Sequence, residues 1–97
     1  MSYTTSTITV RPNTAVPFWD YPDEVKDHIE TNYVITELRL SVSKTFSDDQ
    51  TTRTYTTTWK DRASYTTFLN DPIMLSCRTE IEAYNHSNDI FSFRETL

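Results

Sequence analysis

The chain has 97 residues, a formal charge of −5 and one cysteine, so it suits a single domain over residues 1–97 and cannot form an internal disulfide. The acidic balance and the lack of any basic run argue against nucleic-acid binding. The chain has no glycine, which disfavours glycine-rich phosphate loops and requires Asn or Asp wherever a turn needs a positive φ.

The first predicted elements are a strand and a proline-rich loop. From Tyr3 to Arg11 the side chains alternate with the period of two expected of a strand, which ends at Pro12. One side carries Tyr3, Thr5, Thr7 and Thr9, and the other carries Thr4, Ser6, Ile8 and Val10. The segment 12–22 carries three prolines with three aromatic rings among them, including Trp19. We expect an extended loop whose rings either pack on the core or form a ligand or partner surface.

A short helix and a hairpin are predicted next. Val25 and Ile29 have helical spacing within residues 23–32, and acidic residues at the front suit the helix N-terminus. A strand is expected over residues 33–44, with Leu40 on its apolar side and Arg39 on its polar side. A turn at residues 47–50 then leads into a strand over residues 52–59, so the two strands should pair as an antiparallel hairpin.

The segment from Arg53 to Tyr84 is expected to supply most of the core. Asp61 can cap a helix, and Asp71-Pro72 predicts a break or kink followed by a new helix with Pro72 at its first position. The apolar stripe of that helix is predicted as Ile73, Cys77, Ile81 and Tyr84. We expect Cys77 to be a buried, unreactive thiol and Arg78 to be solvated.

A final strand is predicted over residues 90–95, with Phe91 and Phe93 facing inward. The resulting order is strand, helix, strand, strand, helix, strand, which indicates a ferredoxin-like α+β fold with a four-stranded antiparallel sheet, both helices on one face and the second kinked near Pro72. The uncovered face must be solvated, bind a ligand or pack against a second copy, and the aromatic content favours the last two.

The segment WKDRASYTTFLNDPIM resembles the strand-to-helix junction of the dimeric α+β barrel group, the antibiotic-biosynthesis and haem-degrading monooxygenase relatives. The resemblance implies a homodimer with facing sheets and a ligand cavity between sheet and helices. Where haem-degrading members carry their iron-ligand histidine on the second helix, this chain has Cys77 and Arg78, so no haem cofactor is expected.

Two further segments, YTTSTITVRPNTAVPFW and LNDPIMLSCRTEIEAYNHSNDI, are similar to small proteins without an assigned activity from tailed phages of marine cyanobacteria. No apolar run approaches the roughly 20 residues that cross a bilayer, and the opening residues lack the features of a signal peptide. We therefore expect a soluble, cytoplasmic protein without a membrane partner. If a phage encodes it, the location is the host cytoplasm or the virion.

The candidate pocket residues are the aromatic residues Trp19, Tyr55 and Trp59 together with His86, and core packing of the rings is the competing interpretation. His28 and His86 have no partner at a ligand interval, so we predict surface histidines and no metal site. No residue is assigned as catalytic.

Three functions remain open from the sequence. The first is a homodimeric binding or assembly module. The second is a cofactorless monooxygenase-like enzyme for a hydrophobic substrate, using Trp59, Asn70 or His86. The third is a structural part of a virion.

Overall fold

Four strands form one antiparallel sheet beside three α-helices and a π-helical segment, and the computed structural model describes all 97 residues. In chain order the elements are β1 (Tyr3–Val10), α1 (Asp23–Ile29), η1 (Glu30–Val34), β2 (Arg39–Phe46), β3 (Thr52–Trp59), α2 (Arg62–Asn70), α3 (Pro72–Ser87) and β4 (Phe91–Thr96). The predicted α+β class and the four-stranded antiparallel sheet are confirmed, and the arrangement is consistent with a small ferredoxin-like fold.

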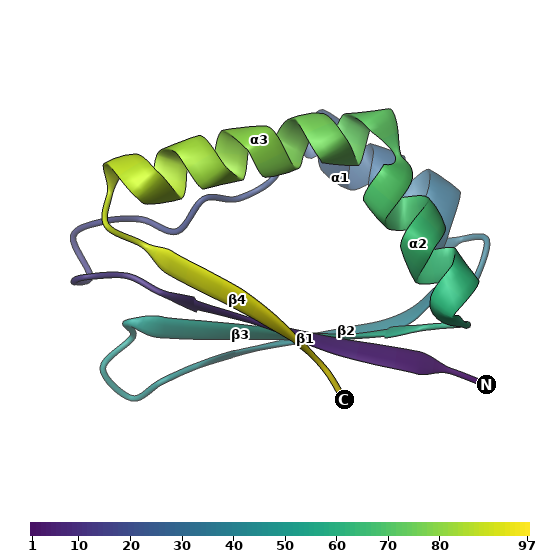
Figure 1. Cartoon of the computed structure of the whole chain (residues 1–97), viewed down its shortest axis with the longest axis horizontal. Helices are drawn as coiled ribbons and strands as arrows, with labels where there is room; N and C mark the ends of the chain where they lie inside the picture. Colours follow the sequence, from purple (N-terminus) through teal and green to yellow (C-terminus); the bar gives the residue numbers. More distant parts are fainter.

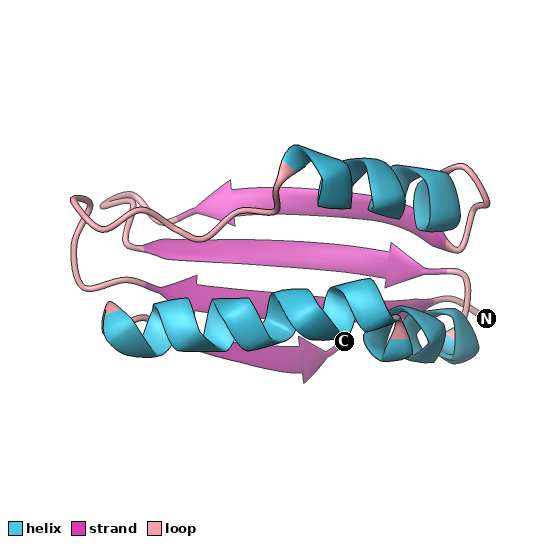
Figure 2. Ribbon diagram, turned by 90° about the horizontal axis from the view of Figure 1, so that it is seen from above, coloured by secondary structure: helices cyan, strands magenta, loops and turns pink.

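The strands lie in the order β2-β3-β1-β4, so the N-terminal and the third strand occupy the middle of the sheet. The predicted hairpin of β2 and β3 is present, and β3 pairs along its whole length with β1. All helices lie over one face of the sheet (Figure 1). Seen from above, α1 lies over the β2 side and α3 over the β1 and β4 side (Figure 2).

The first helical segment is longer than predicted. Helical backbone continues through η1, where the sequence analysis expected the start of a strand. The reason is that Tyr33 follows Val25 and Ile29 at intervals of four, so it extends their apolar face and is buried with them. The strand β2 consequently begins later, at Arg39.

A β-bulge at the start of β2 reverses the predicted facing of its first residues. Arg39 pairs with Trp59 and Ser41 pairs with Thr58, which leaves Leu40 without a partner on β3. Because directly opposite residues share a face, Arg39 lies on the same face as Trp59, under the helices. Leu40 is 54% exposed, so its expected place on the apolar face was wrong.

The segment after β3 divides completely at Asp71, where the backbone is extended (φ −62°, ψ 124°), so two helices replace the single kinked one. Asp61 caps α2 by accepting from the Ser64 amide, and α3 begins at Pro72. The buried residues of α3 are Met74 and Cys77, whereas Ile73 is 43% exposed. The predicted apolar stripe was therefore wrong at its first position, where Met74 takes the place of Ile73.

The last strand carries its apolar residues on the uncovered face. Phe93 pairs with Ile8 and Phe91 with Val10, whereas Ser92 pairs with Thr9 on the face under the helices. Phe91 is 73% and Phe93 50% exposed, so the predicted inward orientation of both rings was wrong. Together with Ile8 and Val10 they form an apolar group on the uncovered face, which we call the open-face patch.

Positive φ angles occur at Glu37, Gln50 and Asp89. The expectation that Asn or Asp would fill such positions holds only for Asp89. None of the helices is long and apolar enough to cross a membrane.

Candidate functional site

A cavity of about 570 Å³ lies between the sheet and the helices. Its sheet side is formed by inward residues of β1 and β3, among them Thr7, Tyr55 and Thr57, and its helix side includes Ile29 and Met74. This volume falls within the range of about 300–1,000 Å³ typical of small-molecule sites. The cavity is therefore the main candidate site of the molecule.

Trp59 lines the cavity from the end of β3. Trp59 is 2% exposed. Its ring centroid lies 4.8 Å from the ring centroid of Phe68, 5.7 Å from that of Tyr65 and 6.2 Å from that of Tyr33. These tilted and edge contacts anchor the ring as a core residue. Its indole nitrogen Nε1 is nevertheless buried without a hydrogen-bond partner, which is rare for a Trp in a folded protein.

Arg53 anchors the proline-rich loop beside the cavity. Its Nη1 donates to Asp20 Oδ1 at 3.1 Å and its Nη2 to the Trp19 carbonyl at 3.3 Å. The guanidinium carbon lies 4.5 Å from the Phe18 ring centroid and 4.8 Å from that of Tyr55. Only its Nε remains buried without a partner.

Arg39 and Arg78 also line the cavity, although the sequence pattern predicts Arg39 on the polar side of its strand and Arg78 on a solvated helix face. The bulge in β2 places Arg39 at the cavity. Arg39 takes part in neither of the two ion pairs of the chain. Arg78 reaches the cavity from α3, where its Nη2 donates to the Leu69 carbonyl at 2.6 Å and its Nη1 is buried without a partner. The period of the sequence does not reveal either residue, because the bulge in β2 and the break at Asp71 change which face each side chain occupies.

The phenol of Tyr21 lies in the same electrostatic environment. Burial raises its pKa most, the Cys77 thiol adds to this, and the positive charges of Arg94 and Arg39 oppose it. Burial also lowers the pKa of Arg39, although an arginine stays charged in proteins. At neutral pH the cavity therefore presents a neutral phenol near two cationic side chains.

The charge of the cavity differs in sign from that of the whole chain. Five cationic side chains line it, Lys26, Arg39, Arg53, Arg78 and Arg94, against three acidic ones, Asp20, Glu30 and Glu82. The lining thus carries two more positive than negative charges, in a chain whose formal charge is −5. Low-dielectric walls strengthen such a local field.

Of the four predicted pocket residues, the structure brings Trp19, Tyr55 and Trp59 to the cavity. His86 does not line it and is exposed near the end of α3. Asn70 lies at a separate shallow depression. The set of Trp59, Asn70 and His86 considered for an enzyme is therefore not assembled at one place.

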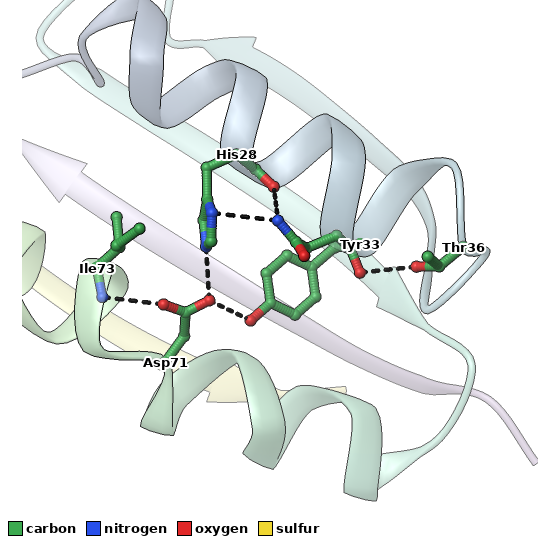
Figure 3. A network of polar contacts seen from close by, with 6 residues as sticks. His28, Tyr33, Thr36, Asp71 and Ile73 are labelled. Carbon is green, nitrogen blue, oxygen red and sulfur yellow. Dashed lines mark hydrogen bonds and ion pairs between the residues drawn. The ribbon is translucent and has the colours of Figure 1, made fainter.

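A second polar cluster joins the first helical segment to the break between α2 and α3 (Figure 3). Asp71 Oδ2 accepts from His28 Nε2 at 2.7 Å and from the Tyr33 hydroxyl at 2.5 Å, while Oδ1 accepts from the Ile73 amide at 2.9 Å. The side chain of His28 is 23% exposed and that of Asp71 11%, so the prediction of a surface histidine was wrong for His28. We call His28, Tyr33 and Asp71 the interhelical clasp.

The hydrogen bonds of the clasp indicate a structural role. The second ring nitrogen of His28, Nδ1, lies 3.1 Å from Asn32 Nδ2, an amide donor, so both ring nitrogens are occupied. In this pattern Nε2 faces the Asp71 carboxylate and Nδ1 faces the Asn32 amide. No group of three or more His, Cys, Asp or Glu side chains lies close enough together to hold a metal ion.

Comparison of the chain with protein-family models, with curated proteins and with solved structures gave no match.

Proposed function

We propose that this chain is a binding module that holds a small ligand with an apolar body in the cavity between its sheet and its helices. The observation that carries the proposal is the cavity of about 570 Å³ lined by Trp59, Tyr55 and Trp19. Protein interiors are normally close-packed, so a space of this size between sheet and helices favours a binding role.

We further propose a ferredoxin-like fold of the dimeric α+β barrel kind, with a homodimer formed through the uncovered face of the sheet. The element order, the central position of β1 and β3, and the placement of all helices on one face support the fold. The exposed open-face patch supports the dimer, because Phe91 and Phe93 gain most from being covered. We also propose a phage origin, because two segments of the sequence are similar to proteins of marine cyanobacterial phages.

The test of ligand binding uses phenylnaphthylamine, an uncharged dye that fluoresces in apolar surroundings. Thr57 lines the cavity, whereas its neighbour Thr56 pairs with Ser6 on the uncovered face. We expect the wild type to bind the dye and Thr57→Trp to bind it about tenfold or more weakly, because the new indole occupies the cavity. Thr56→Trp, the matched control, should bind as the wild type does.

A second variant tests the role of Trp59 itself. Trp59→Phe should lower both stability and dye affinity, since its ring is buried and lines the cavity. If the dye does not bind the wild type, or binds all three variants equally, the cavity is not a binding site. Unchanged affinity of Trp59→Phe with only lost stability would make Trp59 a core residue alone.

A further inference from the structure

The residues that carry buried polar atoms without a partner all belong to the wall of one cavity. There are three such side-chain atoms, Trp59 Nε1, Arg53 Nε and Arg78 Nη1, and all three residues line the same cavity. Each of them is a hydrogen-bond donor and none is an acceptor. Because an unpaired buried donor is costly, the complementary ligand is one that supplies acceptor atoms.

The charge of the lining indicates that the acceptor is an anion. Arg39 is partly buried in the cavity wall without an ion-pair partner, and Arg78 uses only one of its terminal nitrogens on the Leu69 carbonyl. Arg53, in contrast, is already paired with Asp20. Four cationic side chains of the lining thus lie outside the ion pairs, and of these Arg39 and Arg78 are half-buried whereas Lys26 and Arg94 are exposed. Arg39 and Arg78 are therefore the better placed to hold a negatively charged group, although Glu30 also acts on Arg39, and the neutral Tyr21 phenol is an additional donor.

The remaining walls of the cavity suit an apolar, flat molecule. Aromatic rings contribute to it from three separate elements, namely Trp59 and Tyr55 on β3, Phe68 on α2 and Trp19 in the proline-rich loop. Aliphatic contacts come from Ile29 and Met74. Flat aromatic surfaces pack well against rings in offset or edge geometry.

We propose that the cavity binds an amphiphilic organic anion, with a planar apolar body among the aromatic rings and one acidic group held by Arg39 and Arg78. The proposal rests on the binding function above, and it adds the charge of the ligand and the residues that recognise it. Arg53 keeps the loop in place beside the site. It is a positioning residue, because its terminal nitrogens are occupied by Asp20 and Trp19.

The experiment compares two dyes with the same body, phenylnaphthylamine and its acidic counterpart anilinonaphthalene sulfonate. We expect the wild type to bind the sulfonate about tenfold or more tightly than the uncharged dye, because charge-assisted hydrogen bonds are formed only with the sulfonate. Arg39→Gln and Arg78→Gln should each reduce this preference by about tenfold while leaving the affinity for the uncharged dye nearly unchanged.

Arg62→Gln is the matched control. Arg62 is exposed at the start of α2, lies outside the cavity lining and loses the same charge, so the preference for the sulfonate should stay at its wild-type value. Thermal unfolding of each variant identifies any loss of folding.

The outcomes separate the two proposals. Equal affinity for both dyes, or a preference that neither Arg39→Gln nor Arg78→Gln reduces, overturns the anionic ligand and leaves the binding module standing. Failure of both dyes to bind the folded wild type overturns the binding function and the anionic ligand together.

Discussion

Asp71 has two structural roles in one side chain. One carboxylate oxygen caps α3 at the Ile73 amide, and the other joins α3 to the first helical segment through His28 and Tyr33. Burial alone would raise the pKa of Asp71, but the hydrogen bonds from Tyr33 and His28 outweigh it, so the pKa lies below its usual value. Burial, and after it the same contact with Asp71, raises the pKa of Tyr33.

This lowered pKa predicts a stability contribution that depends on pH. A carboxyl group whose pKa is lower in the folded state stabilises the fold above its unfolded pKa of about 4, and the contribution is lost as pH falls through the folded pKa. We expect Asp71→Asn to lower the free energy of unfolding by about 1–2 kcal/mol at pH 7, because the single amide oxygen can accept either from His28 and Tyr33 or from the Ile73 amide, but not at both positions. The difference from wild type should shrink as the pH is lowered below about 4.

Urea unfolding at a series of pH values measures this difference. Asp27→Asn is the matched control, because Asp27 is an exposed acid beside His28 that makes no side-chain hydrogen bond. Asp27→Asn should change stability little at any pH. A loss in Asp71→Asn that is independent of pH would contradict a role of the carboxylate charge.

At the scale of elements, the turn after η1 and the turn between β2 and β3 each contain a residue other than glycine with a positive φ. Glu37 follows the π-helical segment with a φ of 60°, and Gln50 closes the hairpin turn with a φ of 64°. A side chain with a Cβ in this left-handed region costs roughly 1–2 kcal/mol. Asp49 supports the same turn, since hydrogen bonds from Ser47 and Thr51 lower its pKa to about 2.

Glycine at Glu37 should therefore stabilise the protein. The side chain of Glu37 is exposed and makes no hydrogen bond, so Glu37→Gly removes only the backbone strain, less the extra entropy of glycine in the unfolded chain. We expect the free energy of unfolding to rise by about 0.5–1 kcal/mol. Glu24→Gly, inside α1, is the control and should lower it by about 1 kcal/mol. A loss of stability in Glu37→Gly would show that its backbone is not strained.

At the scale of the molecule, all helices cover one face of the sheet and leave the open-face patch exposed. The proposed homodimer predicts that sedimentation of the wild type gives the mass of two chains. Phe93→Lys, opposite Ile8 in the patch, should yield a monomer, because a buried lysine without a partner destabilises an interface.

Ile35→Lys is the control for this prediction. Ile35 is 69% exposed but lies after η1, away from the sheet face. That variant should remain dimeric. A monomeric wild type at the highest accessible concentration would remove the dimer from the proposal and leave the cavity unaffected.

Local features of the sequence determined most of the elements. The alternation of Thr52–Trp59, the caps at Asp61 and Asp71 and the proline at position 72 each act within one turn or one strand. These local signals predict the order of elements and the antiparallel sheet. The aromatic residues predicted for a pocket, Trp19, Tyr55 and Trp59, also line the cavity. Such signals are readable because they depend on neighbours in the chain.

Contacts between distant residues decided the rest. The bulge at Leu40 turns Arg39 toward the helices, and only the pairing of β2 with β3 reveals it. The burial of Tyr33 against Trp59 and Phe68 extends the first helical segment, and Asp71 pairs with His28 across 43 positions of sequence. The aromatic lining could be anticipated from the sequence, whereas the cationic lining required the tertiary structure, because register and packing set which face a charged side chain occupies.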